Sequence, residues 1–335
     1  MAALFVAAML PLRTSAGEET MASPTNTPQS KVNIIYAEAT GSFIVLLAVA
    51  ERQGFFKKYG VDAQTIAARD AVVPRLTTET PIGMIGEPAA LLQAAEGADL
   101  RIVASFSEIN LSGHLVARPE IQKPEGLRGK RVGVRVVGAG IWISTILALE
   151  RLGLDAQRDA ITTVPVGSPV QILRALEEGT IDAALVSARQ SHELEAKGFS
   201  VLLKDYPTDI TSFGGGMMVT TSYLLAHPDI VENVVLALIE ALAFTLAEKN
   251  KEEVMQAFKT SLNIIDADTA ASNLAELKRN PYASPKALKK MQSIIAIHDP
   301  RLLKLKIEDL IEDRFVRKLD ESGQIDHLYA AYGKK

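Results

Sequence analysis

The sequence contains no cysteine. This absence excludes disulfide bonds, thiolate nucleophiles, cysteine-based zinc sites and the lipidated cysteine by which many exported proteins are anchored. The five histidines are scattered along the chain without the spacing of metal ligands. We therefore expect neither a metal site nor a cofactor.

The sequence also lacks a long basic run. Its 36 Lys and Arg residues against 40 Asp and Glu residues give a net charge of -4. Nucleic-acid binding needs clustered positive charge to neutralise phosphates, so nucleic acid is not an expected partner. A length of 335 residues, 47% of them hydrophobic, indicates a globular protein of about two domains.

The first 30 residues do not have the pattern of a folded domain. An apolar run from Ala2 to Leu10 is followed by the small residues 14–16, which resembles a secretory signal and its cleavage site. The basic residues usual before such a run are missing, so either the true start lies upstream or the run is an apolar cytoplasmic tail; we favour export. The run is too short to span a membrane. Residues 18–30, rich in Ser, Thr and Pro, predict a linker.

A complete dinucleotide-binding fingerprint is absent too. The stretch RVGVRVVGAGIW, residues 131–142, has the form of a strand followed by glycines and a helix, but the third glycine position holds Ile143. The nearest candidate for the ribose-binding acid, Asp159, precedes the next apolar run at 161–166 instead of ending it. The glycine turn therefore needs another explanation.

An internal repeat supplies that explanation. Residues 31–55 align with residues 130–154 at a shift of 99 without a gap, and six of the 25 positions are identical, where chance predicts about one or two. Residues 81–105 and 180–203 form a second similar pair, each with the order strand, turn, helix, glycine, strand. We expect two α/β lobes with parallel sheets, whose ligand binds at the carboxyl ends of the strands, in a cleft between the lobes.

Five segments carry a family resemblance: ERQGFFKKYGVDAQ (51–64), MIGEPAALLQAAEGADLRIVAS (84–105), GLRGKRVGV (126–134), LRALEEGTIDAALV (173–186) and YLLAHPDIVENVVLALIEA (223–241). With them the chain, from Lys31 to about Asn250, resembles the periplasmic substrate-binding proteins of the nitrate, sulfonate and taurine type, which include binders of the thiamine pyrimidine precursor.

The resemblance implies an α/β, two-lobed periplasmic-binding-protein (Venus-flytrap, type II) fold. Lobe one then comprises residues 31–110 and 215–335, and lobe two residues 111–214, with crossings near 107–116 and 203–216. The C-terminal helices are expected on lobe one, with one helix opening at His227-Pro228-Asp229 and another restarting in NPYASPKALKKMQ.

The function that the resemblance implies is that of a periplasmic solute-binding protein of an ABC importer, without catalytic activity. It would capture a small organic anion, sulfonate-like or carboxylate-like, by hinge closure, act as a monomer and deliver its ligand to a membrane permease. Three alternatives stay open: a binder of a heteroaromatic such as a thiamine pyrimidine precursor, an enzyme on the same fold of the menaquinone-precursor dehydratase type, and a binding module linked to a sensor.

By the family's layout, ligand contacts come from the loops that follow the strands and from the crossings. The candidate residues are Thr40, Gly41, Phe43, Gly86, Glu87, His114, Gly138, Gly140, Trp142, Ser168, Ser187, Arg189 and Gly214. Backbone N–H groups at glycines, hydroxyls and a guanidinium suit an anion.

Each of these candidates also has a purely structural interpretation. Phe43 and Trp142 could be core residues at helix starts, Arg189 a solvated side chain, and Glu87 a carboxylate that favours its helix dipole. If Glu87 faced the cleft it would repel a bare anion and favour a zwitterion or a heteroaromatic with N–H donors, stacked on Phe43 or Trp142. The glycines at 214–216 are most simply a flexible return strand.

Overall fold

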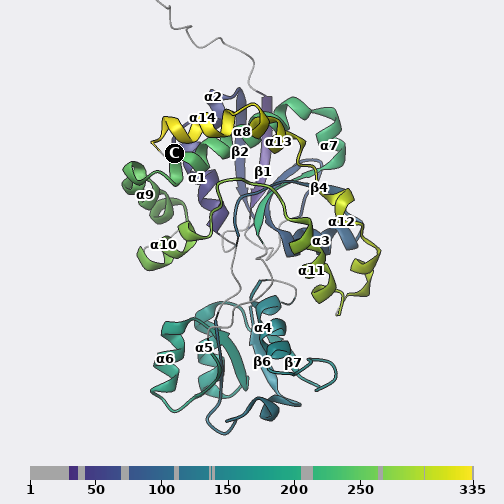
Figure 1. Ribbon diagram of the computed structural model, residues 1–335, viewed down its shortest axis with the longest axis vertical. Helices are drawn as coiled ribbons and strands as arrows, with labels where there is room; N and C mark the ends of the chain where they lie inside the picture. The colour runs from purple at the N-terminus through teal and green to yellow at the C-terminus, as the bar shows by residue number, and fades with distance from the viewer. Residues whose placement is uncertain are drawn as a thin grey trace, which may run out of the picture.

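The computed structural model describes residues 30–36, 42–68, 75–108, 113–135, 137, 140–204, 214–262, 267–297 and 299–333. Three candidate residues, Thr40, Gly41 and Gly138, lie outside the described residues. The described chain forms two lobes, drawn one above the other in Figure 1, and each is built on a five-stranded sheet.

Sheet one lies in lobe one, the upper lobe of Figure 1, and has the strand order β2-β1-β3-β10-β4. Its strands are β1 Ser30–Tyr36, β2 Val61–Ala67, β3 Ile82–Gly86, β4 Leu100–Ser105 and β10 Gly215–Thr220. Sheet two lies in lobe two and has the order β7-β6-β8-β5-β9. Its strands are β5 His114–Ala117, β6 Arg131–Val134, β7 Thr162–Pro165, β8 Ala183–Val186 and β9 Ser200–Leu203.

The two sheets repeat one topology, which confirms the repeat predicted from the sequence. In sheet one β1 pairs in parallel with β2 and β3, and in sheet two β6 pairs in parallel with β7 and β8. The prediction of purely parallel sheets is wrong, because β10 and β5 pair antiparallel with both of their neighbours. Each of these strands is the first one after a crossing from the other lobe, so it enters its sheet from the opposite end. In chain order the sheets alternate twice, from β4 of sheet one to β5 of sheet two and from β9 of sheet two to β10 of sheet one.

The helices nearest the repeated strands also correspond. In lobe one they are α1 Val45–Arg52 after the short 3-10 turn η1 Ser42–Ile44, α2 Phe55–Lys58 and α3 Glu87–Ala95; in lobe two they are η2 Pro124–Leu127, α4 Gly140–Arg151, α5 Pro169–Glu178 and α6 Ala188–Glu195. The first helix of each repeat ends before a glycine with positive φ, 71° at Gly54 and 75° at Gly153. An L side chain rarely adopts this conformation, so both positions favour glycine.

The rest of the chain is helical and packs mainly on lobe one, as predicted. It comprises α7 Thr221–Ala226, α8 Pro228–Thr245, η3 Glu248–Asn250, α9 Lys251–Ser261, α10 Ala267–Ala275, α11 Pro285–Ile295, η4 Pro300–Lys304, α12 Ile307–Leu310, α13 Arg314–Glu321 and α14 Gln324–Ala331. Helix α8 contacts α1, α2 and α14, and α12 and α13 contact β4. Both predicted helix starts are confirmed, at Pro228 and Pro285.

Most of α8 is buried in the core of lobe one. Among the described residues no single helix is long and apolar enough to cross a membrane; α8 together with residues 248–261, bent by 89°, meets that test by length and composition only.

Helix α11 touches both lobes. It packs against α3 of lobe one and against α4 of lobe two (Figure 1). Leu91 of α3, Ile146 of α4 and Met291 of α11 belong to the same buried apolar cluster. Beside it, Gln157 of lobe two donates a hydrogen bond from Nε2 to the carbonyl of Ile297, at 2.7 Å. The lobes are thus joined at a third place, in addition to the two crossings.

Candidate functional site

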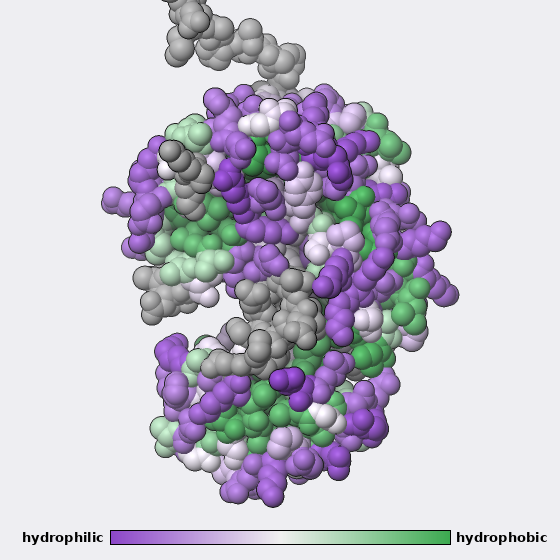
Figure 2. All heavy atoms as spheres, viewed as in Figure 1, coloured by the Kyte–Doolittle hydropathy of each residue, from purple (hydrophilic) through white to green (hydrophobic). Residues whose placement is uncertain are grey.

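A cavity of about 370 Å³ lies in lobe two at the carboxyl end of β8. Its walls come from the starts of β5, α4, α5 and α6, so the first turns of three helices surround it. The lining residues are Gly113, His114, Ile141, Ser144, Pro169, Ile172, Leu185, Val186, Ser187, Ala188 and Gln190. Figure 2 shows the molecular surface hollowed between the two lobes on the left of the view.

Helices α5 and α6 both begin with a capping box. Ser168 caps α5 and Ser187 caps α6, and each forms a capping box with a glutamine three residues later, Gln171 and Gln190. In each box the serine hydroxyl accepts from the glutamine backbone N–H, and the serine N–H donates to the glutamine side chain. The Ser-x-x-Gln pattern at both places is a recognisable capping signal that our sequence analysis missed. Of the two predicted serines, Ser187 lines the cavity and Ser168 does not.

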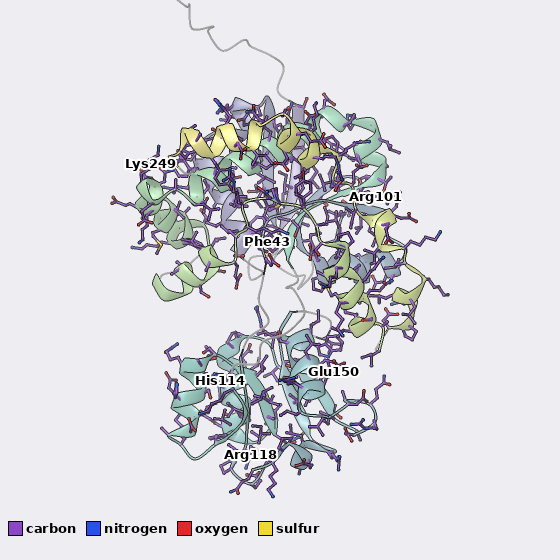
Figure 3. The ribbon with its side chains drawn as sticks, in the orientation of Figure 1. Phe43, Arg101, His114, Arg118, Glu150 and Lys249 are labelled. Carbon is purple, nitrogen blue, oxygen red and sulfur yellow. The ribbon has the colours of Figure 1, made fainter. Side chains whose placement is uncertain are left out.

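His114 links the cavity to the first crossing. It is the first residue of β5, pairs with Val186 in the ladder and is only 3% exposed. Its ring lies edge-on to the ring of His192, with centroids 6.4 Å apart. In Figure 3, His114 lies in lobe two and Phe43 lies at the side of lobe one that faces lobe two.

On the lobe-one side, Phe43 is buried against the returning strand. A Cβ atom on Gly215 would overlap the Phe43 ring, and Cβ atoms on Gly214 and Gly216 would overlap the carbonyls of Ser107 and Ala104. These three glycines are therefore required by close packing of β10 against its neighbours. The interpretation as a flexible strand is wrong for residues 214–216.

The Glu87 side chain is buried in lobe one and is hydrogen-bonded to Gly214, at the end of the second crossing. It is 2% exposed. One carboxylate oxygen accepts from the N–H of Gly214 at 2.8 Å and the other from the hydroxyl of Ser105 at 2.7 Å, while the Glu87 N–H donates to the Gly214 carbonyl. Burial raises the pKa of the Glu87 carboxyl, and the two hydrogen bonds and the charge of Lys278 oppose this effect. Both oxygens thus have partners inside lobe one.

The first crossing is held by the segment between α10 and α11. Ser105 N–H donates to Pro281, Lys278 N–H donates to Phe106, and Glu108 N–H donates to Glu276, each at 3.0 Å or less. Burial also lowers the pKa of the Lys278 ammonium, against the attraction of the glutamates at 87 and 108. Hydrogen bonds thus attach the lobe-one ends of both crossings, residues 105–108 and Gly214, to lobe one.

Trp142 lies in the core of lobe two. Its side chain is fully buried, and its Nε1 donates to Thr163 Oγ1 at 3.2 Å. The preceding candidate, Gly140, is the first residue of α4, and its carbonyl accepts from the Ser144 hydroxyl at 3.0 Å. Neither residue lines the cavity.

Arg189 lies on the outside of α6. Its side chain is 81% exposed and pairs with Glu193 one turn later, at 3.2 Å. It is not among the residues that line the cavity. The structure therefore gives Arg189 the arrangement of a solvated helical residue, and Gly86 that of a strand end paired with Gly215.

A cation that is not among the predicted site residues lies at the carboxyl edge of sheet two. Arg135 directly follows β6 and is partly buried, and this burial lowers the pKa of its guanidinium. Under the shift of 99 its counterpart in lobe one is Tyr36, the last residue of β1. The repeat alignment was the signal that could have identified both positions. Among the described residues no group of three or more His, Asp or Glu lies close enough to hold a metal ion.

The fold is the two-lobed periplasmic-binding-protein fold. The chain passes from lobe one to lobe two before β5 and returns to lobe one before β10. Residues 43–252 match the family described as NMT1/THI5 like, and the chain belongs to this family.

Comparison with individual proteins agrees. The chain is 28% identical over 170 residues to the taurine-binding periplasmic protein of Escherichia coli (strain K12), an alignment covering 50% of this chain and 52% of that protein; the chain thus matches about half the length of this curated relative. The periplasmic aliphatic sulphonate binding protein SsuA from Escherichia coli has the same fold, with a TM-score of 0.61, 19% identity and coverage of 84% and 92% of the two chains. The fold also occurs in the desulfurization enzyme DSZB, with a TM-score of 0.56, 15% identity and coverage of 87% and 99%. The predicted resemblance to substrate-binding proteins of the nitrate, sulfonate and taurine type is confirmed.

Proposed function

We propose that this protein is the periplasmic solute-binding component of an ABC importer, and that it captures a small organic anion, sulfonate-like or carboxylate-like, between its lobes. In this proposal it works as a monomer, delivers the ligand to a membrane permease and catalyses no reaction. The observation that carries the proposal is the cavity at the carboxyl edge of sheet two, beside the first crossing.

The electrostatics of this edge support an anionic ligand. Each of α4, α5 and α6 begins at the cavity, and the N–H groups of a first helical turn carry partial positive charge. Arg135 adds a full positive charge at the end of the neighbouring strand β6. A sulfonate or carboxylate suits both a guanidinium and backbone donors.

The connections between the lobes support capture by hinge closure. Outside the contact made by α11, the lobes are joined by two crossings whose bases are bonded to lobe one through Glu87 and the 276–282 segment. A ligand that contacts both lobes shifts the population from open to closed by its differential affinity for the two states.

The alternatives receive less support. The argument for a heteroaromatic ligand depended on Glu87 facing the cleft, whereas its carboxylate accepts hydrogen bonds from Gly214 and Ser105. An enzyme on this fold is represented by DSZB, a likeness that concerns the fold alone. A binding module for a sensor would have the same architecture, and binding studies with a purified permease would distinguish it.

Titration calorimetry on the full chain tests the proposal, after unfolding and refolding to remove any carried ligand. The panel comprises taurine, alkanesulfonates, small carboxylates, nitrate and aminopyrimidines. We expect saturable one-site binding of a sulfonate or carboxylate, weakened at least about tenfold by Arg135→Gln, since a charge-assisted hydrogen bond contributes about 1.5–3 kcal/mol. Arg189→Gln is the matched control and should leave the affinity unchanged, because its side chain is 81% exposed. Binding of aminopyrimidines alone would refute the anion assignment.

A further inference from the structure

Gln190 lies in the wall of the lobe-two cavity, in the first turn of α6. Its side chain is partly buried. It also lines a smaller cavity, of about 210 Å³, between α5 and α6. The sequence analysis did not include Gln190 among the candidate residues, and its position makes it the neighbour of open space on the side where a ligand is expected.

The capping box of α6 fixes the orientation of the Gln190 carboxamide. Its Oε1 accepts from the Ser187 N–H and from the Ser187 hydroxyl, each at 3.0 Å. A backbone N–H can only donate, so the carboxamide oxygen must face Ser187 and Nε2 must be the other end of the group. Within the described part of the chain no group accepts a hydrogen bond from Nε2, which is accessible to solvent.

The two serine hydroxyls of the lining are arranged differently. The Ser144 hydroxyl donates to the Gly140 carbonyl, and the Ser187 hydroxyl donates to Gln190 Oε1, each at 3.0 Å. The imidazole of His114 also lines the cavity and lies edge-on to the ring of His192. Gln190 thus presents side-chain N–H donors that are both held in direction and available to an incoming acceptor.

We propose that Gln190 is a ligand-binding residue, whose Oε1 closes the capping box of α6 while its Nε2 donates to an oxygen of the bound anion. This inference rests on the proposed function and adds a contact on α6 to the one expected from Arg135. Because the capping box already holds the side chain, ligand binding costs little further conformational entropy there. Since Nε2 can only donate, the contact selects a ligand group that accepts hydrogen bonds.

The capping box of α5 supplies a matched control. Gln171 has the same place in its box and accepts from the Ser168 N–H at 2.8 Å, but it is exposed and does not line the cavity. Methionine at either position removes the carboxamide and keeps an unbranched side chain that favours a helix. Gln190→Met and Gln171→Met therefore lose the same cap, and only Gln190→Met loses the proposed donor.

Titration calorimetry of the full chain with taurine, methanesulfonate and acetate tests the inference. For each anion that the native protein binds, Gln190→Met should weaken Kd at least about tenfold, because a hydrogen bond to a charged group is lost. Gln171→Met should change Kd less than about twofold, because only a helix cap is lost. Thermal unfolding without ligand should show an equal loss of stability in the two variants, since both lose half of a capping box.

A second pair of variants leaves the capping boxes intact. Glutamate suits this position of the box as well as glutamine does, so Gln190→Glu and Gln171→Glu should fold like the native protein. Gln190→Glu places a carboxylate where the donor was and should weaken anion binding more than Gln190→Met does. Gln171→Glu adds the same charge outside the cavity and should have less effect than Gln190→Glu.

The outcomes separate this inference from the proposed function. Equal Kd values for Gln190→Met and Gln171→Met refute the inference and leave the proposed function standing. A Gln190→Glu protein that binds the anions as tightly as the native protein also refutes the inference alone. Failure of the native protein to bind any sulfonate or carboxylate refutes the proposed function together with the inference.

Discussion

Replacing Glu87 separates the effect of its charge from that of its hydrogen bonds. Because its pKa is raised, the folded protein binds a proton at Glu87 more tightly than the unfolded chain does. The stabilising effect of that proton is complete below the ordinary pKa of 4.5 and is lost as the pH rises through the raised value. The ionised form of this side chain is therefore held in the folded protein at an electrostatic cost.

Glu87→Gln removes the charge and keeps the bonds. The amide oxygen accepts from the Gly214 N–H, and the amide nitrogen donates to the Ser105 hydroxyl, which rotates to accept. We expect the free energy of unfolding at pH 7 to stay within about 1 kcal/mol of the native value. Glu87→Ala leaves two buried donors, on Gly214 and Ser105, without an acceptor and should cost about 2–4 kcal/mol.

Urea unfolding followed by circular dichroism, at several pH values between 5 and 8, measures both effects. On lowering the pH, the native protein should gain stability relative to Glu87→Gln, because only the native carboxyl takes up a proton. Glu253→Gln, on the exposed face of α9, is the control and should match the native curve. A Glu87→Gln protein as unstable as Glu87→Ala would show that the negative charge itself is required, and would refute this reasoning.

Two further predictions concern packing and capping. Gly215→Ala should cost about 1–3 kcal/mol of stability through overlap with the Phe43 ring, and Phe43→Leu in the same chain should recover part of this loss; strictly additive costs in urea unfolding would contradict the contact. Gln171→Ala removes half of the capping box of α5 and should lower stability by about 1 kcal/mol, whereas Gln256→Ala, at an exposed position in α9, should not; equal thermal shifts for the two variants would show that the box does not stabilise the helix.

The overall architecture was predictable because the repeat is local. A strand, a glycine turn and an amphipathic helix leave a clear pattern in 25 residues, and the matching glycines at 54 and 153 end corresponding helices. Pro228 and Pro285 mark helix starts by the same local chemistry. The direction of β5 and β10 was not predictable in this way, since it depends on how the chain crosses between lobes.

The candidate site was less predictable because its side chains are placed by distant partners. Glu87 and Gly214 are 127 residues apart, and nothing near either residue in the sequence indicates that they bond. Trp142 and Ile141 are neighbours, yet only Ile141 lines the cavity, because the phase of α4 turns the indole into the core. The glycines at 214–216 indicate close packing only when Phe43 is known to lie on them.

Because α11 contacts both lobes, separating the lobes costs more free energy on the side of α11 than on the opposite side. Pulling lobe two away on that side would expose apolar surface of Met291, Ile295 and their neighbours on α4, at about 25 cal/mol for each Å² of apolar area. It would also break the bond from Gln157 to Ile297. In the proposed capture of a solute by hinge closure, rotation of lobe two about an axis near α11 would avoid both costs and would open the protein on the opposite side, where Figure 2 shows the surface hollowed. In that proposal α11 sets the direction of entry, although the described residues that line the cavity all belong to lobe two.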